Sequence, residues 1–201
     1  MKKMSVFDRI LLLATGLLAA YQVVEGVDGL TTPPLVSYSV AFGVLLVAGL
    51  LLIILGFEVL DSPLVVIVST VIPLSLSLGL VWEYLTAWRI PYLLFAIVGF
   101  LAIVVTRLTK TGRLATFVLA AVHGVAGLII FILPIALSVT EQAKPGFALV
   151  GVGGALIGVG GLLLSFLKAG KPILSRKTIL KVLPGLLLLM TAAFVAGLAL
   201  A

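Results

Sequence analysis

His123 is the residue best placed to do chemistry in this sequence, because it is the single histidine and lies nine residues beyond Leu114, where an apolar run begins. An imidazole at such a depth can be a neutral ring bonded to a carbonyl or hydroxyl group, a proton relay or an axial haem ligand. A haem would need a second ligand, and Met4 and Met190 are the candidates besides the first residue. We expect the structural role. His123 then stays neutral, because charging a buried group is costly, and one ring nitrogen has a partner within about 3.2 Å on an adjacent helix.

A second set of polar side chains follows the apolar run 63–85. Thr70, Pro73 and Ser77 share one helical stripe, and Glu83 stands near the end of the run. Pro73 lacks a backbone donor and so frees a carbonyl group near the middle of the run. Side chains of this kind can line a path for a small solute, and the candidate path residues are Thr70, Ser77, Glu83 and His123. Hydroxyl groups more often hold membrane helices together, so we expect packing.

The run 147–167 is rich in glycine. Spacings of three and four residues place four of its glycines on one helix face, namely Gly151, Gly154, Gly158 and Gly161. Gly154 and Gly158 form a GxxxG pair, which lets transmembrane helices approach closely. A similar face of small residues surrounds His123 in the run 114–139, and it consists of Ala120, Gly124 and Gly127. We expect both faces to be helix-packing surfaces, either within this chain or in a homo- or hetero-oligomer.

Several kinds of reaction centre are excluded by missing residues. The chain has no cysteine, which rules out disulfides, thiol nucleophiles and thiolate metal sites. One histidine cannot form a bis-histidine haem site or a two-histidine metal site within one chain. The sequence contains no nucleophile elbow, Walker loop or paired buried carboxylates, so we expect no enzyme, no metal and no cofactor. Asparagine is absent and glutamine occurs twice, a trait of thermophile proteins that a lipid-buried composition also produces.

The elements that must position these residues are membrane-spanning helices. Of the 201 residues, 63% are hydrophobic and 10% are charged, and the mean hydropathy is +1.41. A soluble domain is about half apolar and about a quarter charged, so a soluble fold is excluded, as is disorder. About 20 apolar residues cross the hydrocarbon core. We therefore predict an all-α integral membrane protein, a seven-transmembrane-helix bundle that forms one polytopic domain over residues 1–201. The predicted spans are 10–30, 35–57, 63–85, 90–106, 114–139, 147–167 and 179–201.

The first span has an alternative interpretation. Lys2 and Lys3, followed by an apolar run, resemble a secretory signal peptide. The segment Leu18-Ala19-Ala20 is a poor cleavage site, so we expect an uncleaved first helix. Farther along, Ser62 before Pro63 predicts a capped helix start with proline in the first position.

The orientation follows from the lysine and arginine residues, which favour the cytoplasmic side. With the N-terminus inside and the C-terminus outside, the inner segments carry eleven of them and the outer segments two. The inner residues are Lys2, Lys3, Arg9, Arg107, Lys110, Arg113, Lys168, Lys171, Arg176, Lys177 and Lys181. The outer residues are Arg89 and Lys144. The net charge of +6 then indicates affinity for anionic lipid head groups on the inner side of a cell membrane and requires no nucleic acid.

Acidic and aromatic residues gather near the predicted outer ends of the spans. The acidic residues Glu25, Asp28 and Glu83 fit solvated helix ends, or alternatively a rim that attracts cations. The aromatic residues are expected to anchor the membrane interface, and they are Trp82, Tyr84, Trp88 and Tyr92.

Three functions remain open. The first is a non-catalytic helical subunit or scaffold that packs against other membrane proteins, which we favour. The second is a small-solute transporter or channel with a path along the third and fifth spans. The third is an intramembrane enzyme or haem carrier that uses His123. A dry bundle favours the first, and a hydrated cavity lined by the candidate path residues favours the second.

Overall fold

The computed structural model describes residues 4–109, 112–168 and 173–201, and these residues form seven α-helices. The helices are α1 (Val6–Glu25), α2 (Thr32–Leu55), α3 (Pro63–Tyr84), α4 (Arg89–Thr109), α5 (Arg113–Val139), α6 (Ala148–Lys168) and α7 (Arg176–Ala199). Short 3-10 helices join some of them, namely η1 (Phe57–Asp61), η2 (Thr86–Trp88) and η3 (Pro145–Phe147). All seven α-helices are long and apolar enough to cross a membrane. The predicted all-helical fold is therefore confirmed, and its seven long apolar helices are compatible with a multi-pass membrane bundle.

Local sequence signals set the helix ends. Helix α1 starts at Val6, four residues before the predicted span, because Ser5 and Asp8 form a reciprocal capping box. It ends at Glu25, before the predicted end, because Gly26 adopts a φ of +71°, which interrupts the helix. Helix α3 starts where expected, with Ser62 in the N-cap position and Pro63 in the first turn, but the Ser62 side chain makes no capping hydrogen bond.

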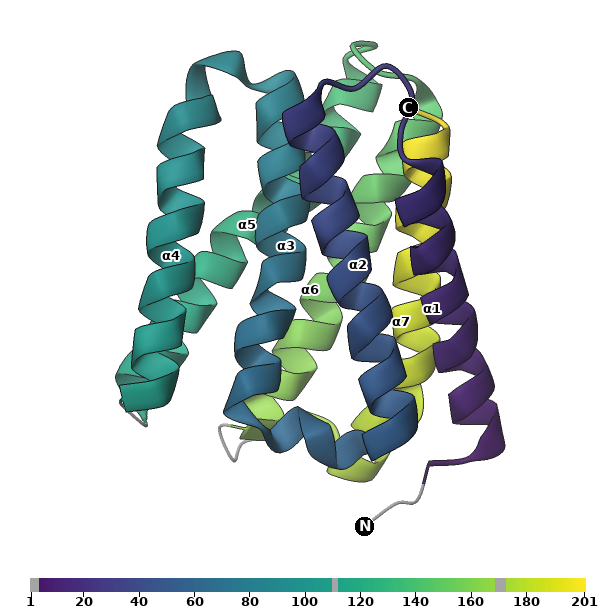
Figure 1. Cartoon of the computed structure of the whole chain (residues 1–201), viewed down its shortest axis with the longest axis vertical. Coiled ribbons are helices and arrows are strands. Elements are labelled where there is room, and N and C mark those ends of the chain that lie inside the picture. The colour runs from purple at the N-terminus through teal and green to yellow at the C-terminus, as the bar shows by residue number, and fades with distance from the viewer. Residues whose placement is uncertain (1–3, 110–111, 169–172) are drawn as a thin grey trace.

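The helices alternate in direction, so the bundle has two ends (Figure 1). We call the end where α1 begins the bottom end, and the end where α7 finishes the top end. Helices α1, α2, α3, α5, α6 and α7 contact one another in that order, and α7 returns to α1. Helix α4 lies outside this ring against α3 and α5.

The apolar core is divided into three clusters. The main cluster fills the upper half of the ring and includes Phe42, Leu80 and Phe194. A second cluster joins only α3, α4 and α5, and Ile103 is one of its fully buried members. A third cluster lies at the bottom between α1, α2, η1 and α7, with Leu12 fully buried. The helices of the ring thus share the main cluster, whereas α4 belongs only to the second cluster.

The outer surface of the bundle is apolar on every helix. Large exposed side chains include Leu17 on α1, Val98 on α4 and Leu189 on α7. Such a surface would be unusual in water, whereas lipid tails solvate it as well as a protein core does. This surface agrees with the membrane class.

Candidate functional site

The hydroxyl groups of the predicted polar path are used in packing. Thr70 and Ser77 are fully buried, and each donates a hydrogen bond to a backbone oxygen of α3, at 2.8 Å to Val66 and 2.6 Å to Pro73. Tyr92 of α4 donates to the Ser77 hydroxyl at 2.7 Å. Tyr92 is therefore a buried link between two helices, in contrast to the interface anchor expected from the sequence.

The four candidate path residues do not line a common cavity. Glu83 lies half-buried at the top end of α3, one residue before the helix ends. His123 lies in the lower half of α5, and its Nδ1 atom is buried with no hydrogen-bond partner in the described part of the chain. The expected bond to an adjacent helix is therefore not formed there. Thr70 and Ser77, which lie in the middle of α3, are sealed from solvent.

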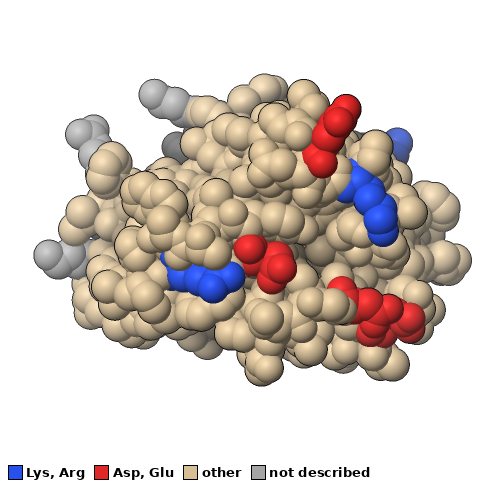
Figure 2. Space-filling model, turned by 90° about the horizontal axis from the view of Figure 1, so that it is seen from above, with Lys and Arg blue, Asp and Glu red and all other residues tan. Residues whose placement is uncertain are grey.

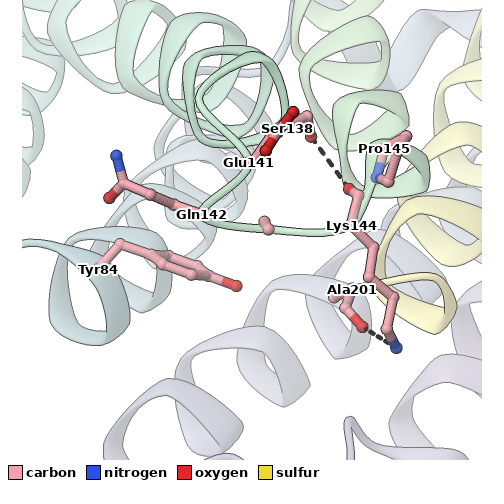
Figure 3. Close-up of a pocket in the computed structure, with 8 residues that line it drawn as sticks. Tyr84, Ser138, Glu141, Gln142, Lys144, Pro145 and Ala201 are labelled. Carbon is pink, nitrogen blue, oxygen red and sulfur yellow. Dashed lines mark hydrogen bonds between the residues drawn. The ribbon is translucent and has the colours of Figure 1, made fainter.

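A shallow hollow of about 640 Å³ opens at the top end instead. Its lining residues are Tyr84, Ser138, Glu141, Gln142, Ala143, Lys144, Pro145 and Ala201. Figure 3 shows the Lys144 side chain extending to Ala201, where its ammonium donates to the backbone oxygen at 2.9 Å. All of the lining residues lie at the top end, and Thr70, Ser77 and His123 are not among them.

The predicted glycine face of α6 is covered only in its upper part. A Cβ atom placed on Gly151 would lie 2.6 Å from the backbone oxygen of Phe131, and one on Gly154 would lie 2.9 Å from the backbone of Ile130. These distances are closer than real Cβ contacts, so α5 and α6 meet backbone to backbone here. Only glycine permits this approach.

The lower part of the same face is uncovered. A Cβ atom on Gly158 or Gly161 would meet no atom within 4 Å, and the same is true of Gly124 and Gly127 on α5. Ala120 is exposed as well. The two helices are antiparallel, so one turn below the Gly154 contact Gly158 is level with Gly127. A further turn down, Gly161 is level with Gly124. We call the space between these four glycines the bottom gap.

Two polar atoms in the lower parts of α4 and α5 are buried without a hydrogen-bond partner among the described residues. Helical spacing places His123 one turn below Gly127, on the side of α5 that faces α6 higher up. Arg107, at the bottom of α4, has a buried Nε atom with no partner among the described residues, and its charge is close enough to act on the His123 ring. A buried polar atom without a partner is costly.

Sequence reasoning overlooked two of the polar residues near the bottom end. Asp8 is buried, and the Ser5-Val6-Phe7-Asp8 pattern could have identified its capping role. Arg107 stands one turn beyond Ile103, which is fully buried. That spacing was the one available sign that Arg107 points inward.

Charges differ between the two ends. Figure 2 shows the top end, where a few acidic and basic side chains, some of them side by side, are scattered over a largely uncharged face. Arg89 is held there by Trp82, since its Nε donates to the Trp82 backbone oxygen and the guanidinium lies 5.8 Å from the ring centre. At the bottom end, Arg176 of α7 pairs with Asp61 of η1 at 2.8 Å. Both partners are at least half exposed, so this pair contributes little to stability, about 0–1 kcal/mol.

Comparison with known protein families, with curated proteins and with solved structures gives no match for this chain. The function must therefore be argued from the geometry of its own residues.

Proposed function

We propose that this protein is a non-catalytic, multi-pass membrane subunit that binds a transmembrane helix of another membrane protein in the bottom gap. The observation that carries the proposal is that two glycine-lined helix faces, which we call the glycine walls, have no neighbouring atom within 4 Å of a Cβ position. They consist of Gly124 and Gly127 on α5 and of Gly158 and Gly161 on α6. An apolar helix that enters the gap can bring its side chains directly onto two backbones.

The physics of the bilayer supports a helix as the occupant. Lipid tails are as apolar as leucine, so transmembrane helices associate through close packing and hydrogen bonds. The upper part of the same glycine face already binds a helix in this way, where Gly154 meets the backbone of Ile130.

The transporter alternative has less support. Thr70 and Ser77 each donate a hydrogen bond to a backbone oxygen of α3, and the Ser77 hydroxyl also accepts one from Tyr92. A solute that followed this stripe would have to break those bonds within a packed apolar cluster. An enzyme would need several polar groups around one reacting atom, and the candidate residues are spread along the height of the bundle.

The membrane and the orientation are part of the proposal. We place the protein in the cell membrane with the bottom end in the cytoplasm, because the basic residues are concentrated in the segments of that end. The bottom gap then opens within the inner leaflet, next to anionic lipid head groups.

Site-specific photo-crosslinking in native membranes tests the proposal. A photoreactive side chain is placed at Leu128 or Val159, which flank the gap and are about half exposed. Leu17 on α1 and Val98 on α4 are control positions of similar exposure. We expect protein adducts from the two gap positions and lipid adducts alone from the controls, with the mass of each adduct distinguishing a second copy of this chain from a different protein.

A matched variant shows whether the glycine wall is responsible. Gly158→Leu should abolish the protein adduct at Val159, because a bulky side chain would keep the partner helix away from the α6 backbone. Lipid adducts alone at all four positions of the unaltered protein would refute the proposed function.

A further inference from the structure

We infer that the bottom gap is the open state of a two-state element, in which the lower parts of α4 and α5 swing together about Pro134 and close onto α6. This inference deepens the proposed function, on which its regulatory meaning rests, because closure would fill the site that a partner helix needs. The closure itself involves residues of this chain alone.

The division of the core shows which parts can move. The α3–α4–α5 cluster and the bottom cluster of α1, α2, η1 and α7 share no residue. Above them, Ile130 and Leu137 tie the upper part of α5 into the main cluster. Below Ile130, α5 contributes Val122 and Ala126 to the α3–α4–α5 cluster only. The lower part of α5 is therefore anchored at its top and is not packed into the core that lies across the gap.

Helix α4 must move with α5. A Cβ atom placed on Gly99 would lie 3.0 Å from one methyl group of Val122 and 3.7 Å from its Cβ atom. Ala96 and Ile103 belong to the same cluster as Val122. Their tight contact lets the two helices move as one arm, which must slide over α3 because Ile67 and Leu74 belong to the same cluster.

The hinge lies where the α5–α6 contact ends. Pro134 lies inside α5 and has no N–H group, so the backbone oxygen of Ile130 lacks its usual helical donor. Proline is a common cause of a helix kink. Going down α5 from the top end, Ile130 and Phe131 are also the last residues that meet the glycines of α6. The backbone hydrogen bond that is missing because of Pro134 therefore lies where the two helices begin to diverge.

No atom lies directly against the facing glycines of α5 and α6. The gap faces of both helices carry glycine at matching heights, and no atom lies within 4 Å of a Cβ placed on any of them. Closure would extend downward by about two turns the backbone contact already made at Gly154. It would also carry the unpaired Nδ1 of His123 toward the backbone oxygens of α6.

Disulfide trapping tests the closure, and the absence of native cysteine makes the readout clean. The paired variants are Gly127→Cys with Gly158→Cys and Gly124→Cys with Gly161→Cys. A disulfide needs Cβ atoms about 3.5–4.5 Å apart, and no heavy atom of the opposite helix lies within 4 Å of a Cβ atom placed at any of these positions. We expect an intramolecular disulfide to form in both pairs on mild oxidation of membranes.

The control pair is Gly99→Cys with Val122→Cys, whose Cβ distance of 3.7 Å already suits a disulfide. A disulfide in the control pair without one in either gap pair would overturn the inference. Disulfides between two chains in the gap pairs would overturn it too. Adding Pro134→Ala should cause loss of the gap disulfides and leave the control disulfide unchanged, and gap disulfides that persist would overturn the assignment of the hinge.

A second readout separates closure from the proposed function. In the Val159 photo-crosslinking assay, the oxidised Gly127→Cys and Gly158→Cys protein should lose its protein adduct and regain it on reduction. An adduct that is unaffected by the disulfide would overturn the regulatory role of closure. Absence of the adduct from the unaltered protein would refute the proposed function, while the disulfide result would still decide whether the arm closes.

Discussion

At the scale of single residues, hydroxyl side chains satisfy the buried polar chemistry of this bundle largely within their own helices. Thr15, Thr70 and Thr191 are fully buried, and each donates to the backbone oxygen four residues earlier. Such a bond removes the cost of an unpaired hydroxyl group in an apolar core. The Tyr92–Ser77 bond is different because it joins α4 to α3.

Tyr92→Phe should weaken the contact between α3 and α4 by a modest amount. Ser77 keeps its bond to the Pro73 oxygen in the variant, so one interhelical bond is lost and no buried group is left unpaired. Such bonds average about 0.6 kcal/mol in membrane proteins. A double-mutant cycle with Ser77→Ala, measured by unfolding in detergent, should give a coupling energy of about that size. A coupling energy of zero would show that the hydroxyl groups do not interact in the membrane.

Glu141 has a backbone conformation that favours glycine. Its φ is +58°, and the next residue, Gln142, donates its N–H to the Leu137 oxygen at 2.9 Å. These features form the glycine-type end of a helix, here α5. A non-glycine residue in this region costs about 1–2 kcal/mol.

Glu141→Gly should therefore raise the free energy of unfolding by about 1 kcal/mol, which thermal unfolding in detergent can measure. Gln142→Gly is the matched control. Its φ is not positive, so glycine there should bring no gain. A loss of stability in Glu141→Gly would mean that the carboxylate makes a stabilising interaction at the top end.

At the scale of helices, sequence patterns could predict the elements but not their neighbours. The apolar runs and their proline and glycine breaks placed α5 at 114–139, within one residue of the observed Arg113–Val139. The order of the ring was not accessible, because lipid-facing and protein-facing surfaces are equally apolar in a membrane. For the same reason, nothing in the glycine spacing distinguishes Gly154, which is covered, from Gly158, which is open.

The candidate polar path shows the same limit. Helical spacing correctly placed Thr70 and Ser77 on one stripe of α3, and both lie on its buried face. Their partners could not be predicted, because a hydroxyl group can bond to its own helix or to a solute with the same sequence pattern. The depth of His123 within the bundle could be predicted from its position in the apolar run 114–139. The divergence of α5 from α6 could not be predicted, because it depends on packing across the whole bundle.

Alanine at Gly154 and at Gly158 should have opposite effects. A methyl group on Gly154 would collide with the Ile130 backbone, and overpacking of this kind costs about 1–3 kcal/mol. Gly158→Ala meets open space and should leave stability unchanged or slightly higher, since alanine is the better helix former. Unfolding in detergent measures both variants. Equal losses would indicate that Gly158 is also covered.

At the scale of the whole molecule, the bundle joins a closed upper half to a divided lower half that carries most of the positive charge. Among the described residues, the basic ones at the bottom end are Arg9, Arg107, Arg113, Lys168, Arg176, Lys177 and Lys181. The top end has Arg89 and Lys144 together with Glu25, Asp28, Glu83 and Glu141. This asymmetry runs along the axis on which the helices would cross a bilayer.

The topology prediction rests on that asymmetry, since lysine and arginine are retained on the cytoplasmic side. Because the chain lacks cysteine, single cysteines can be labelled without background. Asp28 and Glu141 are exposed at the top end, and Glu58 is exposed at the bottom end. A maleimide that cannot cross membranes should label Asp28→Cys and Glu141→Cys on intact cells, and Glu58→Cys only after permeabilisation. The reverse pattern would overturn the orientation. Equal labelling of Asp28→Cys and Glu58→Cys on intact cells would mean that α2 does not cross the membrane.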